Sequence, residues 1–196
     1  NNSDRPKNPD NGSYAAKVYA LVLIGTVTSK FKDQDVTNEK IRMTWEYMCN
    51  GFAYYISKEY TLSLHEKATL RKDLQSLRGK KFTQEELDCF IIDSILGFDC
   101  LITIENQTAA NGNDYPNLIS MCPLPKGMPM HTAILPSFIF SWEGMDKFEQ
   151  IGLLSDEDNR IPKFIKEKML STPEYKKWNV DPFEAPVQTK AVKAAD

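Results

Sequence analysis

The sequence predicts a mainly β fold with helical additions. Five strand patterns occur between residues 14 and 125. A helical pattern is inserted between the third and the fourth, which gives the order β-β-β-α-β-β. A glycine also interrupts the long first strand pattern, as a strongly bent strand requires. We therefore expect a small, curved sheet with a helix that plugs the space between its two halves.

The first strand is expected over Tyr14–Phe31, which is rich in Val, Ile, Leu and Thr and contains Gly25 in its interior. Glycine at such a position permits a bulge or a sharp bend, so one strand can serve both sides of a small barrel. The following residues, Lys30–Lys40, are polar and predict a loop.

The second and third strands are predicted to form a hairpin. Residues 41–48 alternate between two faces, one of which consists of Ile41, Met43, Trp45 and Tyr47. Such alternation is typical of a half-buried strand. Asn50 and Gly51 then favour a tight turn, and residues 53–64 form the third strand pattern.

A basic amphipathic helix is expected next. Ser63 and Glu66 have capping-box spacing at its start, and Gly79 favours a left-handed cap at its end. The apolar stripe of the helix comprises Leu70, Leu74 and Leu77. Its basic flank comprises Lys67, Arg71 and Arg78.

A second, short helix is expected to begin at Thr83. Thr83 and Glu86 repeat the capping-box spacing, and Phe82 with Leu87 has the spacing of a hydrophobic staple. This helix is expected to end near residues 96–97, before the fourth strand.

The last two strands of the sheet are expected over Phe98–Glu105 and Tyr115–Leu124, joined by a hairpin loop at Asn106–Asp114. Five strands, a bent first strand and a helix between the third and fourth strands together indicate a five-stranded OB-fold barrel. A generic five-stranded α+β sheet is the alternative.

The chain is expected to have three parts. Residues 1–13 are rich in Asn, Asp, Pro and Gly and predict a flexible leader, and residues 14–125 form the OB-fold domain. Residues 126–196 predict a C-terminal extension with short helices and a tail. Pro162 suits the first position of one of these helices.

Composition narrows the class of protein. The four cysteines are scattered without a C-x-x-C pair and only two histidines occur, so we expect reduced thiols and no metal site. No apolar run approaches the ~20 residues that cross a bilayer. No hydrophobic signal core is visible, so we expect a cytoplasmic protein without a membrane partner.

The charge is distributed unevenly. Residues 14–82 carry 12 Lys and Arg against 7 Asp and Glu, a net +5. Residues 83–196 carry 10 against 18, a net −8. A basic front half is typical of a face that binds a polyanion, although mixed surface charge without a partner remains an alternative.

The sequence lacks nucleophile-elbow, zinc-protease and phosphate-loop motifs, and no carboxylate lies in an apolar context that would raise its pKa. We therefore expect a binding protein without enzymatic activity or cofactor. His131 lies in a Pro-rich loop with no companion nearby in the sequence.

Single-stranded nucleic acid is held by aromatic side chains that stack on bases and by cations that neutralise phosphates. In an OB-fold the groove crosses strands two and three, between the loops that join strands one to two and four to five. Trp45 and Tyr60 each share a face with apolar residues, so core packing and base stacking both remain open for them. Tyr55 alternates with Ser57 and Glu59 and is expected to be exposed. The candidate binding residues are Lys30, Phe31, Lys32, Arg42, Trp45, Tyr55, Lys58, Tyr60, Lys67, Arg71 and Tyr115.

Four segments resemble a family of phage proteins. They are Y-T-L-S-L-H-E-K-A-T-L-R-K-D-L-Q-S-L-R-G-K-K-F-T-Q-E-E-L, L-G-F-D-C-L-I-T-I, Y-P-N-L-I-S-M-C-P-L-P-K-G-M and I-P-K-F-I-K-E-K-M-L-S-T-P-E-Y. Together they resemble the bacteriophage-encoded OB-fold single-stranded DNA-binding proteins. The resemblance covers about residues 14–178. It implies sequence-tolerant binding of single-stranded DNA during phage replication or recombination, in the cytoplasm of an infected bacterium.

Many such binders end in an acidic tip that recruits replication enzymes. This chain ends in A-V-K-A-A-D, and only residues 181–184 (D-P-F-E) approach such a tip. The alternative function is an OB-fold interaction module that docks a phage or host replication or recombination protein with little DNA binding of its own. Whether the chain forms a homo-oligomer is open.

Overall fold

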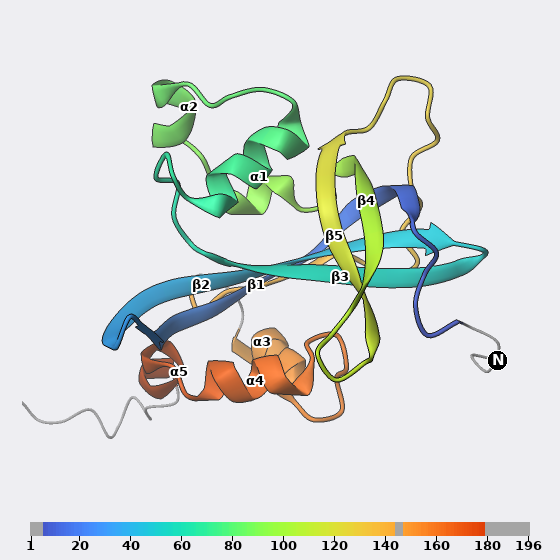
Figure 1. Cartoon of the computed structure of the whole chain (residues 1–196). Coiled ribbons are helices and arrows are strands. Elements are labelled where there is room, and N and C mark those ends of the chain that lie inside the picture. The colour runs from blue at the N-terminus through green and yellow to red at the C-terminus, as the bar shows by residue number, and fades with distance from the viewer. Residues whose placement is uncertain (1–5, 144–146, 179–196) are drawn as a thin grey trace, which may run out of the picture.

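The computed structural model describes residues 6–143 and 147–178 (Figure 1). Its strands are β1 (Gly12–Phe31), β2 (Gln34–Cys49), β3 (Phe52–Thr61), β4 (Asp99–Thr108), β5 (Asp114–Pro123) and β6 (Phe138–Phe140). Its helices are α1 (Thr69–Arg78), α2 (Gln84–Asp88), the 3₁₀ helix η2 (Ile92–Ile95), α3 (Lys147–Leu154), α4 (Lys163–Leu170) and α5 (Pro173–Trp178). The expected mainly β fold and the order β-β-β-α-β-β are therefore confirmed.

The strands form one sheet in the order β3-β2-β1-β4-β5, with antiparallel neighbours. The short strand β6 pairs with β1 in the parallel direction. Strands β3 and β5 come close together, but they are not hydrogen-bonded within the described residues. The sheet is therefore open, and a closed OB-fold barrel is not confirmed.

The sheet lies between two groups of helices, with α1 and α2 on one side and α3, α4 and α5 on the other (Figure 1). The side that carries α1 contains the larger core, which we call the helix-side core. There the predicted leucine stripe of α1 is buried against strand residues that include Trp45 and Ile102. The predicted amphipathic character of α1 is confirmed.

The opposite side contains a second core between β1 and the C-terminal extension, which we call the extension-side core. Its members are Tyr19, Ala20, Val22, Ile24, Phe138, Phe140, Leu153, Ile161, Ile165 and Met169. A register shift in β1 between Val18 and Ala20 lies at Tyr19. Tyr19 and Ala20 therefore both pack in the extension-side core, while Val18 and Leu21 pack in the other.

Several turn predictions are confirmed. The ladder between β1 and β2 shifts register between Leu23 and Gly25, and Gly25 has φ +102°. At this φ any side chain would be strained, and a Cβ would also lie 2.7 Å from Glu174 Oε2, so the position favours glycine. Asn50 and Gly51 have φ values of +50° and +80° and join β2 to β3 as a tight hairpin.

The predicted loop at Lys30–Lys40 is wrong in most of its length. β1 continues to Phe31 and β2 begins at Gln34, so the connection is only Lys32 and Asp33, with φ values of +49° and +62°. Backbone pairing along the ladder, which extends to Phe31 opposite Gln34, overrides the polar composition of this stretch.

The predicted start of the first helix is also wrong. α1 begins at Thr69, its N-cap residue is Ala68, and no side chain caps it. The Ser63 hydroxyl instead accepts a hydrogen bond from the His65 amide, and His65 Nδ1 accepts one from the Lys67 amide. These local bonds satisfy the backbone in a loop and so compete with helix formation. The left-handed cap at Gly79 is confirmed, with φ +72°.

The capping box of the second helix is confirmed in both directions. The helix itself is shorter than expected: α2 ends at Asp88, and the separate 3₁₀ helix η2 covers Ile92–Ile95. The C-terminal extension, for which short helices and a tail are expected, also contributes the strand β6, which joins the sheet. The tail from residue 179 onward and residues 1–5 of the expected leader lie outside the described residues.

Candidate nucleic-acid interface

A cavity of about 400 Å³ lies between the sheet and the C-terminal extension; we call it the sheet–extension pocket. The sheet contributes Tyr19, Arg42, Thr44, Tyr55 and Ser57 from β1, β2 and β3. The extension contributes Leu135, Asn159, Arg160 and Pro162. The strand residues reach this side by alternation, because Ile41, Met43 and Trp45 on β2 point into the opposite core. The pocket therefore lies on the face of β2 and β3 that is turned away from the helix-side core.

Two tyrosines form the aromatic part of this pocket. Tyr19 is buried, and its ring centroid lies 5.0 Å from that of Tyr55 and 5.5 Å from that of Phe138. Tyr55 is 39% exposed, which confirms that it lies at the surface as alternation along its strand suggested. The packed rings hold Tyr55 in place, so it offers a surface on which a planar ligand could stack.

Arg42 supplies a half-buried positive charge. Within the described residues its guanidinium has no hydrogen-bond acceptor or ion-pair partner, and it lies 5.5 Å from the ring centroid of Phe164. Burial lowers the pKa of Arg42, and the negative charge of Glu59 opposes this only in part. Glu59 is itself ion-paired with Lys168 at 2.8 Å. Arg42 stands opposite Glu59 in the ladder but shares that carboxylate with Lys168, so its charge is only partly balanced.

Arg160 differs because it is fully engaged with the carboxylate of Asp158. Its Nη2 lies 2.6 Å from Oδ2 and its Nε 3.1 Å from Oδ1. These hydrogen bonds hold the pKa of Asp158 below its ordinary value, against the opposing effect of burial. The buried Lys166 donates to the backbone carbonyl of Ser155, at 2.5 Å, and to that of Asp158. This network fixes the loop that forms one wall of the pocket.

The floor of the pocket is polar. Thr44 and Ser57 stand opposite each other on β2 and β3, and their hydroxyl oxygens are 2.9 Å apart. Hydroxyl groups can both donate and accept, so the floor can meet either kind of polar edge of a ligand.

Residues 126–137, which we call the strap, connect β5 to β6 and are fastened to the sheet by Glu46. This carboxylate is fully buried; its Oε1 lies 2.7 Å from His131 Nε2 and accepts a hydrogen bond of 2.7 Å from the Ile134 amide. Glu46 Oε2 is also buried, with no hydrogen-bond partner in the described part of the chain. Because Leu135 of the strap lines the pocket, Glu46 helps to hold the pocket's second wall.

His131 has no companion nearby in the sequence, but in the fold its ring contacts the carboxylate of Glu46. The partners are 85 residues apart, and no local pattern joins them. Of the candidate binding residues, the structure brings Arg42 and Tyr55 together in the pocket. It adds Tyr19, Asn159 and Arg160, which sequence reasoning missed.

Two of the candidate binding residues are buried in the core, so they do not offer a surface to a ligand. Trp45 is completely buried in the helix-side core. Tyr60 is 3% exposed, and its hydroxyl donates to Asp73 of α1 at 2.8 Å. Burial and the Asp73 carboxylate raise the pKa of Tyr60. Lys58 is ion-paired with the same carboxylate at 2.7 Å. The packing of α1 on β3 therefore uses these side chains for structure.

The remaining candidates lie away from the pocket. Lys30 and Lys32 are exposed at the turn between β1 and β2, and the side chain of Phe31 lies outside what is described. Lys67 is exposed before α1, and Arg71 donates to the carbonyl of Leu64 at 3.2 Å. Tyr115 is 44% exposed on β5, and its hydroxyl donates to Gln107 at 3.2 Å.

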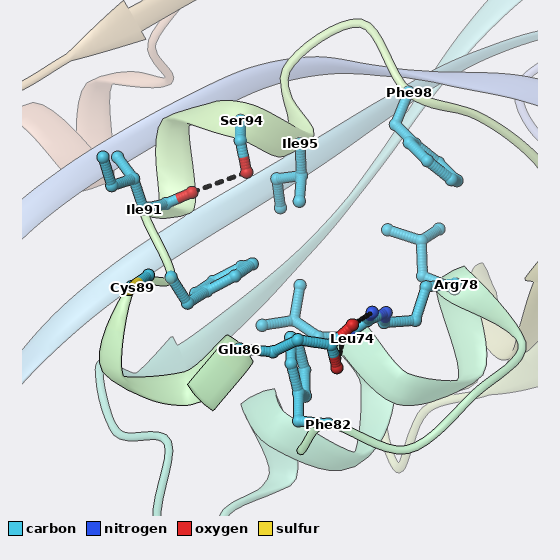
Figure 2. A pocket seen from close by; sticks show the side chains of 11 residues that line it. Leu74, Arg78, Phe82, Glu86, Cys89, Ile91, Ser94, Ile95 and Phe98 are labelled. Atoms are coloured by element: carbon cyan, nitrogen blue, oxygen red, sulfur yellow. Dashed lines mark hydrogen bonds and ion pairs between the residues drawn. The ribbon is translucent and has the colours of Figure 1, made fainter. Parts of the chain in front are cut away.

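A second cavity of about 400 Å³, the helical pocket, lies between α1, α2 and η2 (Figure 2). Leu74, Phe82 and Ile95 contribute to its largely apolar lining, and Ile91 on its rim is 66% exposed. Figure 2 shows the ion pair between Arg78 and Glu86 at one side of this cavity. This pocket has none of the only partly balanced charge found in the sheet–extension pocket.

Metal ligands do not gather in the described ranges 6–143 and 147–178, where no group of three His, Cys, Asp or Glu side chains could hold an ion. The four cysteines, Cys49, Cys89, Cys100 and Cys122, are free. No helix in the described part of the chain is both long enough and apolar enough to cross a membrane.

Comparison with known proteins finds no family model and no curated protein that matches this chain. The resemblance to phage single-stranded DNA-binding proteins therefore stays a prediction.

Proposed function

We propose that this protein binds single-stranded DNA, with tolerance for sequence, on the face of β1, β2 and β3 that carries the sheet–extension pocket. The observation that carries the proposal is that the weakly compensated Arg42 and the exposed ring of Tyr55 line one cavity. An arginine meets a phosphate with paired hydrogen bonds, and a tyrosine face stacks on any base.

The strand order supports an OB-type fold for this function. An OB-fold is a five-stranded, partly open barrel that binds oligonucleotides on the face of its second and third strands. Strands β2 and β3 supply Arg42, Thr44, Tyr55 and Ser57, four of the pocket's residues. In this proposal the protein is a cytoplasmic, non-enzymatic protein of phage replication or recombination, as its sequence resemblance implies.

The proposal is tested by fluorescence anisotropy with labelled oligo-dT, a matched duplex and a matched single-stranded RNA. Phosphate neutralisation predicts that affinity falls as salt rises from about 50 mM to about 200 mM. We expect oligo-dT to bind more tightly than the duplex. The comparison of oligo-dT with single-stranded RNA shows whether the protein prefers deoxyribose or ribose. Equally negligible affinity for oligo-dT and duplex at low salt would refute the proposal.

The second candidate is a module that docks a replication or recombination protein, and the helical pocket favours it. Its exposed Ile91 and apolar lining suit an apolar side chain of such a protein. If this function is correct, the parent protein has negligible affinity for DNA and captures the partner protein from infected cells. The variant Ile91→Asp should then no longer capture it. A truncation before Ile161 separates a role of the extension from one of the pocket. Retention of every partner by both variants would refute this candidate.

A further inference from the structure

The sheet–extension pocket is walled on two sides. Five of its residues come from the sheet, and the other four come from the strap and from residues 159–162 of the extension. Its volume of about 400 Å³ lies within the range of about 300–1,000 Å³ that is usual for small-ligand sites. A cavity of this size between two walls suits one unit of a polymeric ligand better than a length of single-stranded nucleic acid that lies flat along the sheet.

The charges around the cavity distinguish its two arginines. Arg160 is held by Asp158 through a forked set of hydrogen bonds, so its charge is already balanced. Arg42 has no such hydrogen-bonded partner within the described residues, and Glu59, which stands opposite it in the ladder, is ion-paired with Lys168. A half-buried guanidinium without an acceptor is stabilised when an anion reaches it. Arg42 is therefore the side chain of the cavity that is best suited to receive an anion.

The remaining lining suits a planar, polar ring next to that anion. Tyr55 offers the face of its ring, backed by Tyr19 at 5.0 Å between centroids. Thr44 and Ser57 supply hydroxyls, and Asn159 supplies an amide that can donate and accept. These groups can pair with many polar edges without requiring one pattern, which agrees with tolerance for sequence.

We infer that the sheet–extension pocket is a subsite for one nucleotide, with its phosphate on Arg42 and its base against Tyr55. The inference rests on the proposed function and deepens it, because it names the unit of the strand that the pocket recognises. One chain then holds one nucleotide in the pocket, and neighbouring nucleotides lie outside it. A free nucleoside monophosphate should therefore bind without the rest of the strand.

The experiment uses the full chain and isothermal titration calorimetry with thymidine monophosphate, thymidine and inorganic phosphate. We expect thymidine monophosphate to bind in a 1:1 ratio, at least about tenfold more tightly than either of its parts, because both contacts contribute. Oligo-dT is measured in parallel by anisotropy.

Four variants assign the contacts. Arg42→Gln removes the positive charge and should weaken the binding of both thymidine monophosphate and oligo-dT about tenfold or more. The slope of log affinity for oligo-dT against log salt should become shallower by about 0.7, which is the value for one phosphate of a single strand. Tyr55→Leu should weaken thymidine monophosphate more than phosphate. Glu59→Gln should strengthen phosphate binding, because it removes the opposing carboxylate. The matched control is Lys72→Gln, which removes an exposed cation from α1 on the other side of the sheet and should change nothing.

The outcomes separate this inference from the proposed function. If oligo-dT binds but thymidine monophosphate does not, or if Arg42→Gln behaves like Lys72→Gln, the nucleotide subsite is wrong and DNA binding stands. If phosphate alone binds as tightly as thymidine monophosphate, the base contact is wrong. If oligo-dT does not bind either, the proposed function fails. If Arg42→Gln does not fold, Arg42→Lys replaces it: this variant keeps the charge but loses the forked donors, so thymidine monophosphate should bind more weakly while the salt slope for oligo-dT stays unchanged. An unchanged affinity for thymidine monophosphate would then refute the contact between Arg42 and the phosphate.

Discussion

Glu46 holds the strap against the sheet, and its removal should lower the stability of the protein by a measurable amount. The carboxylate is fully buried and serves both His131 and the Ile134 amide, each at 2.7 Å. Hydrogen bonds to a charged acceptor contribute about 1.5–3 kcal/mol each, and part of that is offset by the desolvation of the unpaired Oε2. Breaking a buried pair by removing one partner costs about 3–5 kcal/mol. We therefore expect Glu46→Ala to lower the free energy of unfolding by about 3 kcal/mol.

Urea unfolding followed by tryptophan fluorescence measures this change, and hydrogen exchange at the Ile134 amide shows where it acts. A loss of 3 kcal/mol corresponds to about a hundredfold faster exchange of an amide that opens with the strap. Glu46→Gln keeps one acceptor oxygen and should lose only about 1 kcal/mol. The reasoning fails if Glu46→Ala lies within about 0.5 kcal/mol of the parent and the Ile134 amide keeps its protection.

Three further outcomes are expected. Hydrogen bonds from Arg78, and then from Lys80 and the Thr83 amide, lower the pKa of Glu86 from 4.5 to about 2. The stabilisation by Glu86 is therefore complete above about pH 4.5 and is lost as the pH falls toward 2, so acid unfolding curves of Glu86→Gln and the parent should converge there. Gly25→Ala should lower the melting temperature more than Gly112→Ala, since both positions have positive φ but only Gly25 meets a neighbour, at 2.7 Å; equal losses would contradict the close approach. Trp45→Phe should cost about 1–2 kcal/mol in urea unfolding and leave oligo-dT affinity unchanged, so a tenfold affinity loss with the fold intact would contradict its burial.

The strands and turns were predictable because their signals are local. Alternation along β2 and β3 reports which residues share a face, and this pattern survives in the structure. Gly25, Gly51 and Gly79 all have positive φ, a conformation in which glycine has no steric penalty. The second capping box also holds, because both of its partners lie within one helical turn.

Local patterns failed where two local solutions compete. Ser63 and Glu66 have the spacing of a capping box, yet Ser63 bonds to the His65 amide and the helix starts six residues later, at Thr69. Residues 30–40 are polar, but pairing between the end of β1 and the start of β2 makes most of them strand. Composition ranks such alternatives, whereas the choice between them depends on contacts with the rest of the chain.

The candidate site was only half predictable for a different reason. Alternation places Arg42 and Tyr55 on the face away from Trp45 and Ile56, so sequence alone brings these two residues to one side of the sheet. It does not show that a C-terminal extension covers the same side. Arg160 enters the pocket from more than 100 residues away, and the strap is fastened by Glu46 and His131, which are 85 residues apart.

The sheet–extension pocket therefore combines two kinds of information. The periodicity of β2 and β3 determines which side chains face outward, because a strand has a repeat of two residues. Whether an outward side chain meets solvent, a core or a ligand depends on what packs above it. In this protein the extension buries Tyr19 and encloses Arg42 but leaves Tyr55 exposed, and only the tertiary structure decides these three outcomes. Packing between distant segments has no periodicity in the sequence, and it is this packing that turns one face of a predictable sheet into a pocket.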